Sequence, residues 1–250
     1  LRPGIRRHGA YWYLSSKEGI FAIDEHSGFV ASIWDSQKGL CTTISHDVYT
    51  LETITKIRKA DEYFDEVVKS EKTKRRLELV CKNENLPGVL LHKAYWLELN
   101  GRILAKEVTV QGKADEKKLL SISSKTVFDK EYRIQSYYNR VLSTAASGGA
   151  DHRATIAAKA ITEPMIQRGG FNQPCGWSQF ALVNPERGGG IAQYLYKTDD
   201  EYVWPPYSLN SSYWNANGWE VSFLATFLKS EPFSSQMRYH LFRGDQLSFY

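Results

Sequence analysis

Alternation of apolar and polar residues with a period of two constrains this chain more than any other feature. Residues 47–57 show it well, with apolar side chains at Val48, Tyr49, Leu51, Ile54 and Ile57. Such alternation sends successive side chains to opposite faces of an extended strand. Comparable segments recur about every 8–12 residues, and almost no segment has the spacing of an amphipathic helix. The pattern predicts an all-β protein, built as a large antiparallel β-sandwich.

Turn signals between these segments support antiparallel hairpins. Asn100-Gly101 separates the alternating runs 90–99 and 102–110, and both residues tolerate a positive φ. A second tight turn is predicted at residues 26–28, between the strands 21–24 and 29–35. The sequence therefore predicts hairpins as the main connection between neighbouring strands.

Composition limits the class of protein. The 250 residues are 42% hydrophobic, which suffices for a core, and no run of about 18 apolar residues predicts a membrane span. The net charge of +4 is too small to predict a nucleic-acid partner. We expect residues 1–250 to form a single β-sandwich domain, and the first residue, Leu1, suggests a piece of a larger multidomain protein. The three cysteines, Cys41, Cys81 and Cys175, lack metal-binding spacing, so we predict no metal and no cofactor.

Charge is concentrated in one segment, residues 56–78, which holds 8 Lys/Arg and 6 Asp/Glu. Strand pairs with solvated faces fit this segment better than a helix does. An interaction face is the alternative, but the balanced signs do not favour nucleic acid.

Aromatic residues gather near the C-terminal end, in residues 201–220. Pro205-Pro206 interrupts ladder pairing, so we predict loops that carry aromatic rings rather than a regular strand. Flat rings can stack on the apolar face of a sugar, while neighbouring amides sort its hydroxyl groups. The alternative is that the rings fill a small core beneath long loops. The predicted ligand-binding residues are Trp204, Tyr207, Tyr213, Trp214, Asn215, Asn217 and Trp219.

Evidence for catalytic chemistry in the sequence is weak. Cys175 lies in a loop framed by Gly and Pro but has no identifiable base nearby, so a structural thiol is favoured. His152, between Asp151 and Arg153, and the carboxylate of Glu220 are the candidates for an acid–base pair.

Two stretches, residues 19–35 and 95–110, resemble hairpins of galactose-mutarotase-like supersandwich domains. The first has the pattern strand, Asp24 to Gly28 turn, strand and Trp34-Asp35, and the second ends in Glu107-Val108-Thr109-Val110. The resemblance implies a β-supersandwich of the kind found in glycoside hydrolases and polysaccharide lyases. The histidine motif of the aldose epimerases, N-H-x-x-F-N, is absent, so no catalytic residue is carried over.

The function predicted from these observations is a carbohydrate-associated module of a glycoside-processing protein. It would bind glycan or pack against an adjacent catalytic domain of the same polypeptide, and an extracellular or cell-surface location would fit such work. One alternative is an enzyme of the sugar epimerase, mutarotase or lyase type that uses a His/Glu pair. Another is a purely structural sandwich without a ligand.

Overall fold

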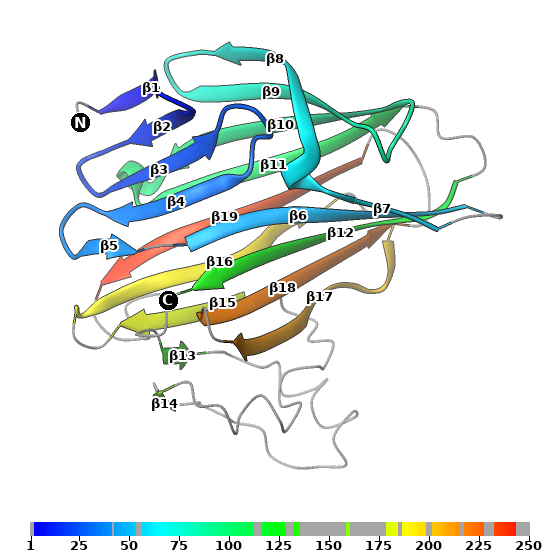
Figure 1. Ribbon diagram of the computed structural model, residues 1–250. Coiled ribbons are helices and arrows are strands. Elements are labelled where there is room, and N and C mark those ends of the chain that lie inside the picture. The colour runs from blue at the N-terminus through cyan, green and yellow to red at the C-terminus, as the bar shows by residue number, and fades with distance from the viewer. Residues whose placement is uncertain are drawn as a thin grey trace, which may run out of the picture.

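The computed structural model describes residues 3–41, 43–53, 57–112, 117–128, 133–135, 159–160, 179–184, 187–198, 202–215, 218–227 and 233–243. In these residues the chain forms two antiparallel sheets, which lie one over the other in Figure 1. The prediction of an all-β antiparallel sandwich is confirmed. None of the helices in the described residues is long and apolar enough to cross a membrane.

Ten strands of the described residues form the sheet that we call sheet A. Eight of them lie side by side in the order β1 (Gly4–His8), β2 (Tyr11–Ser15), β3 (Gly19–Asp24), β4 (Val30–Asp35), β6 (Thr43–Thr53), β12 (Lys117–Phe128), β18 (Gly218–Phe227) and β17 (Tyr202–Asn215). The short strands β5 (Gly39–Cys41) and β7 (Ile57–Asp61) pair with β4 and β6, respectively.

Nine strands of the described residues form sheet B. Their order is β14 (Lys159–Ala160), β13 (Arg133–Gln135), β15 (Gln179–Asn184), β16 (Gly189–Thr198), β19 (Phe233–Arg243), β11 (Ile103–Gly112), β10 (Val89–Glu98), β9 (Arg76–Asn83) and β8 (Asp65–Lys72). The short helix η1 (Glu62–Phe64) joins the two sheets between β7 and β8, and η2 (Leu99–Gly101) joins β10 to β11.

The predicted hairpins form at the expected residues. Asn100 and Gly101 have φ values of 56° and 91°, so the turn between β10 and β11 uses the positive φ that this dipeptide tolerates. At the turn after β3, Asp24 Oδ1 accepts hydrogen bonds from the backbone nitrogens of His26 and Ser27, at 3.0 and 2.8 Å. These local bonds fix the turns without help from the core.

The core between the sheets consists of alternate residues from strands of both layers. Fully buried members include Phe21 and Ile33 from sheet A and Leu79, Leu91 and Leu104 from sheet B. Cys81 is also buried there as a free thiol. Burial of this apolar surface is the main force that holds the two sheets together.

Five charged side chains lie inside this core, which the sequence reading did not anticipate. Lys93 Nζ contacts Glu62 Oε1 and Asp65 Oδ2, each at 2.7 Å. Lys106 Nζ contacts Glu62 Oε2 at 2.8 Å and Asp47 Oδ2 at 3.0 Å. All five are at most 5% exposed. The prediction of solvated strands for residues 56–78 is therefore wrong at Glu62 and Asp65, because both carboxylates turn inward to meet buried lysines.

Polar contacts of this kind connect the two sheets. Lys93 Nζ donates to the carbonyl oxygen of Ser27 at 2.6 Å, which ties β10 to the turn between β3 and β4. Tyr239 in β19 and Ser45 in β6 hydrogen-bond through their hydroxyl groups at 2.6 Å. Because hydrogen bonds are directional, these contacts fix the position of one sheet relative to the other. Apolar packing alone would define that position less precisely.

Candidate functional site

The face of sheet B that points away from sheet A is polar over strands β8 to β11 and β19. Side chains of β9 alternate between buried and exposed or half-buried, so Leu77 and Leu79 enter the core while Arg76 and Glu78 stand on the opposite face. The register places Arg76 beside Trp96 of β10. The same alternation that builds the core therefore presents a row of polar groups on the outer face.

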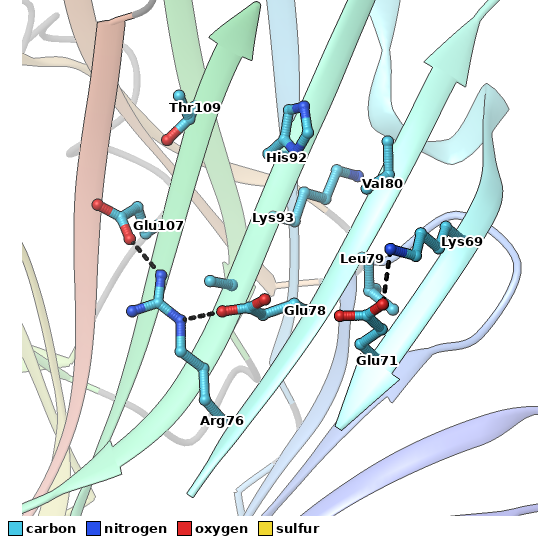
Figure 2. Close-up of a pocket in the computed structure, with 11 residues that line it drawn as sticks. Lys69, Glu71, Arg76, Glu78, Leu79, Val80, His92, Lys93, Glu107 and Thr109 are labelled. Carbon is cyan, nitrogen blue, oxygen red and sulfur yellow. Dashed lines mark hydrogen bonds and ion pairs between the residues drawn. The ribbon is translucent and has the colours of Figure 1, made fainter. Parts of the chain in front are cut away.

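A hollow of about 310 Å³ lies on this face, over β8 to β11. Figure 2 shows the side chains of Arg76, Glu78 and Glu107 side by side, with His92 further along the same face. Leu79 and Lys93 also border the hollow, but their side chains belong to the core. The residues lining it are Lys69, Glu71, Arg76, Glu78, Leu79, Val80, His92, Lys93, Ala94, Glu107 and Thr109.

Glu107 is the centre of a hydrogen-bonded network along one wall. Its Oε2 accepts from Arg76 Nη2 at 2.7 Å, and its Oε1 accepts from Ser234 Oγ at 2.9 Å and Gln236 Nε2 at 3.0 Å. Burial would raise the pKa of Glu107, but these hydrogen bonds and the guanidinium charge lower it below its usual value. Glu107 is therefore a fixed, ionised acceptor that holds the neighbouring donors in place.

Trp96 stands between two arginines beside the hollow. The guanidinium carbons of Arg76 and Arg238 lie 4.7 and 5.1 Å from its ring centroid, and they come from strands on opposite sides of β10. Its indole nitrogen donates to Glu98 at 2.7 Å, and Arg238 Nε donates to the same carboxylate at 2.9 Å. Cation–π contacts and charge-assisted bonds thus fix the ring in place.

Two side chains lining the hollow, Arg76 and His92, have a buried nitrogen atom without a hydrogen-bonding partner in the described residues. Arg76 Nε still forms an ion pair with Glu78 at 3.0 Å, so His92 Nε2 is the one of the two that lacks a charged partner as well. The register places His92 across from Val80 of β9 and Thr109 of β11. Its Nε2 is buried and has no hydrogen-bonding partner. A buried polar atom without a partner costs free energy, so this nitrogen is a candidate for a hydrogen bond to water or to a ligand group.

The chemistry available in the hollow favours binding over proton transfer. Both oxygens of Glu107 accept bonds already, and its lowered pKa makes it a weak base. In the residues that the structure describes, no three His, Cys, Asp or Glu side chains are grouped to hold a metal ion. What the wall offers is a set of oriented donors and acceptors of the kind that sorts ligand hydroxyl groups.

The predicted aromatic surface is placed differently from the expectation. Residues 202–215 form the edge strand β17 rather than loops, so that prediction is wrong. The break expected from Pro205-Pro206 appears as a register shift between Tyr202 and Tyr207, which an edge strand tolerates because its outer side is unpaired. In the ladder, Trp214 pairs with Trp219 and Tyr213 with Glu220 of β18.

The side chains of the predicted ligand residues in β17 and β18 lie outside the described part of the structure, as does that of Glu220. His152, Asn217 and Cys175 lie outside the described residues altogether. The acid–base pair and the aromatic stacking surface therefore stay predictions.

The hollow was not predicted, although the sequence contains a signal for it. Arg76 and Glu78 were assigned to a solvated face, and His92 was not predicted as a site residue. In the stretch 89–97, the side chain of His92 alternates with those of Leu91 and Lys93, so it shares the outer face of the strand with Leu90, Ala94 and Trp96. Only pairing of β9, β10, β11 and β19 brings these residues together, because they come from segments far apart in the chain.

Comparison by sequence finds little: no family model matches the chain, and no curated protein matches it. Solved structures do match. A galactose mutarotase-like protein from Lactobacillus casei has a TM-score of 0.59 at 10% identity, over 92% of this chain and 99% of that chain. A putative aldose 1-epimerase from Escherichia coli K12 has a TM-score of 0.55 at 14% identity, over 93% of this chain and 99% of that one.

The third match is to part of a larger protein. The α-N-acetylgalactosaminidase NagBb from Bifidobacterium bifidum has a TM-score of 0.52 at 12% identity, over 95% of this chain but 37% of that one. At these identities the likeness concerns the fold. The chain therefore has the galactose-mutarotase-like β-sandwich fold, which it shares with mutarotase-like proteins and with part of a glycoside hydrolase.

Proposed function

We propose that this chain binds a saccharide in the hollow over β8 to β11. The observation that carries the proposal is the buried, unpartnered Nε2 of His92 beside a wall of fixed donors and acceptors. A sugar hydroxyl can both donate and accept, so it can satisfy this nitrogen in either tautomer. The likeness in fold to a mutarotase-like protein and to part of a glycosidase supports a saccharide as the ligand.

The match to 37% of the glycosidase supports a role as one module of a larger protein. In that role the hollow would hold glycan for an adjacent catalytic domain. The oriented wall around Glu107 suits this task, because holding a ligand needs fixed hydrogen-bond directions and no change of protonation.

A sugar-converting enzyme is the second candidate, since His92 and Glu107 line the same hollow. The bonded oxygens and lowered pKa of Glu107 argue against it as a general base. Polarimetry of galactose mutarotation separates the two functions. A rate above the uncatalysed one that disappears in His92→Phe favours the enzyme, and an unchanged rate favours the binding module.

The decisive experiment is saccharide binding by the wild type and by His92→Phe. Phenylalanine keeps the size of the ring but removes the nitrogen. An array of neutral and acidic glycans identifies a ligand, and calorimetric titration then measures its affinity. We expect affinity to fall about 3- to 10-fold, the equivalent of one hydrogen bond. The free energy of unfolding should stay constant or rise, because the substitution removes a buried polar atom that has no partner.

His26→Phe is the matched control, because that side chain is 78% exposed and does not line the hollow. It should leave affinity unchanged. Trp204→Ala and Trp214→Ala test the predicted aromatic surface on β17 in the same assay. If His92→Phe binds every glycan as the wild type does, while a tryptophan variant loses affinity, the hollow is not the saccharide site.

A further inference from the structure

The end of the β8–β9 hairpin carries a group of cations that the saccharide hollow does not account for. Lys72, Lys74 and Arg75 are exposed there. Lys72 Nζ donates to the carbonyl oxygen of Ile5 at 3.3 Å, which brings the hairpin end beside β1. Figure 1 shows the two elements next to each other at the same end of the sandwich. We call the side chains of Lys72, Lys74 and Arg75 the basic patch.

These cations lack the acidic partners that several cations near them have. Arg7 pairs with Glu25, Lys69 with Glu71, and Arg76 with Glu107. In the described residues, by contrast, no carboxylate forms an ion pair with any member of the basic patch. The patch therefore presents about three uncompensated positive charges in a protein whose net charge is only +4.

The turn that carries the patch is held in a defined shape. Thr73 N donates to the carbonyl oxygen of Arg76 at 2.8 Å, and Thr73 Oγ1 accepts from the backbone nitrogens of Arg75 and Arg76 at 3.2 and 3.0 Å. Lys74 and Arg75 thus stand on an ordered turn, which reduces the entropy lost when they bind an anion.

The patch is continuous with the hollow. Arg76 lines the hollow, and Lys74 precedes it by two residues, so at most about 7 Å separates their Cα atoms. Lys69 and Glu71, on the other arm of the hairpin, also line the hollow. A chain of sugar rings that leaves the hollow at this edge passes directly over the turn.

We propose that the basic patch is a subsite for anionic substituents, sulfate or carboxylate, of a glycan whose end occupies the hollow. The inference rests on the proposed saccharide function and adds to it the chemical class of the ligand. Ammonium and guanidinium groups are the side chains that recognise such anions. A nucleic acid fits less well, because the patch is small and leads into a hollow lined by as many acidic as basic side chains.

The test uses three forms of one probe, a chondroitin 4-sulfate hexasaccharide. The first is intact, the second is desulfated, and the third is desulfated and carboxyl-reduced and so neutral. Calorimetric titration at about 50 mM NaCl should give the intact form about 10-fold higher affinity than the neutral one, and about 300 mM NaCl should remove most of that difference. Persistence of the gain in the desulfated form assigns the contact to carboxylates, and its loss assigns it to sulfates; both support the subsite.

The variant Lys74→Ala/Arg75→Ala removes two exposed charges and leaves the Thr73 turn bonds, which use backbone atoms of residues 75 and 76. It should bind the intact form about 5- to 20-fold more weakly and the neutral form as the wild type does. The matched control, Lys59→Ala/Lys82→Ala, removes two exposed lysines elsewhere and should change neither affinity.

The outcomes separate the two proposals. If the intact and neutral forms bind with equal affinity, and His92→Phe still weakens binding of the neutral form, the anionic subsite is overturned and saccharide binding in the hollow is supported. Affinity for the intact form that depends on Lys74 and Arg75 but not on His92 supports the subsite and overturns the hollow. Binding of a DNA duplex as tight as that of the intact hexasaccharide overturns the subsite in favour of a general polyanion surface.

Discussion

Lys106→Met is the sharpest test of the charged group inside the core. Lys106 Nζ lies 2.8 Å from both oxygens of Glu62 and 3.0 Å from Asp47 Oδ2, and the residue is 2% exposed. Burial opposes its charge, but Asp47 and Glu62 raise its pKa well above the usual value for lysine. Methionine has a similar shape without the charge, so the substitution leaves the carboxylates buried without this counter-ion.

The expected cost follows from charge counting. Two ammonium groups face three carboxyl groups in the wild type, a formal balance of 2 − 3 = −1, and in the variant the balance is 1 − 3 = −2. Removing one partner of a buried ion pair costs about 3–5 kcal/mol of unfolding free energy. For 250 residues the unfolding entropy is about 0.5 kcal/mol per kelvin, so the Tm should fall by about 6–10 °C.

Urea unfolding followed by circular dichroism measures this loss at pH 7.5 and again at pH 5. In the wild type, burial raises the pKa of Glu62 to about 7 in spite of Lys106 and Lys93, whereas Lys106 holds the pKa of Asp47 below its usual value against the effect of burial. In the variant both carboxyl groups lose Lys106, so both folded-state pKa values rise further relative to the unfolded ones. The folded variant then binds extra protons as pH falls, and its deficit against the wild type should shrink at pH 5. Lys106→Met/Glu62→Gln restores the balance to −1 and should cost less than the sum of the single substitutions.

Lys82→Met is the matched control, because Lys82 is exposed on β9, and it should change the free energy of unfolding by at most about 0.5 kcal/mol. The reasoning fails if Lys106→Met stays within about 1 kcal/mol of the wild type at pH 7.5, because that result means that water reaches the carboxylates.

Two further predictions concern the turn after β10 and a half-buried histidine. Gly101→Ala should lower the free energy of unfolding by about 1–3 kcal/mol, because φ is 91° and a Cβ would lie 2.2 Å from that of Ser16. Gly9→Ala, with φ of 58° and open space around it, should cost about 1 kcal/mol in the same urea assay, and equal losses would contradict the steric argument. Burial, with help from Arg102, lowers the pKa of His240 to about 4. Because the unfolded pKa is about 6.5, the folded protein loses stability as pH falls from 6.5 towards 4. In His240→Gln the free energy of unfolding should fall by about 1–2 kcal/mol less over this pH range than in the wild type. If the two proteins have the same pH profile of stability, the argument is wrong.

Local sequence information was sufficient for the strands and several turns. Alternation of side chains along a strand depends on the backbone of that strand alone, so residues 90–99 and 102–110 were predicted as a hairpin around Asn100-Gly101, and the structure pairs 89–98 with 103–112. The same alternation also places Lys93 and Lys106 among the side chains of these two strands that point into the core. A lysine at such a position predicts a buried carboxylate partner, because an unpaired charge in a core is too costly.

The prediction of loops for residues 201–220 was wrong because the position of a strand within a sheet cannot be read from local sequence. Two prolines exclude the interior of a sheet but not its edge, and the sequence alone does not say which strand is outermost. The order of strands is set by pairing between distant segments, such as β12 with β6 and β18.

By itself, then, the sequence determined that this chain forms antiparallel strands joined by tight turns, because both follow from steric rules acting over a few residues. Tertiary structure alone decided which carboxylates meet Lys93 and Lys106, and which strands bring Arg76, His92 and Glu107 around one hollow. Charge pairing and hollow formation act through space at distances of a few ångströms, and only the folded arrangement of the two sheets sets those distances.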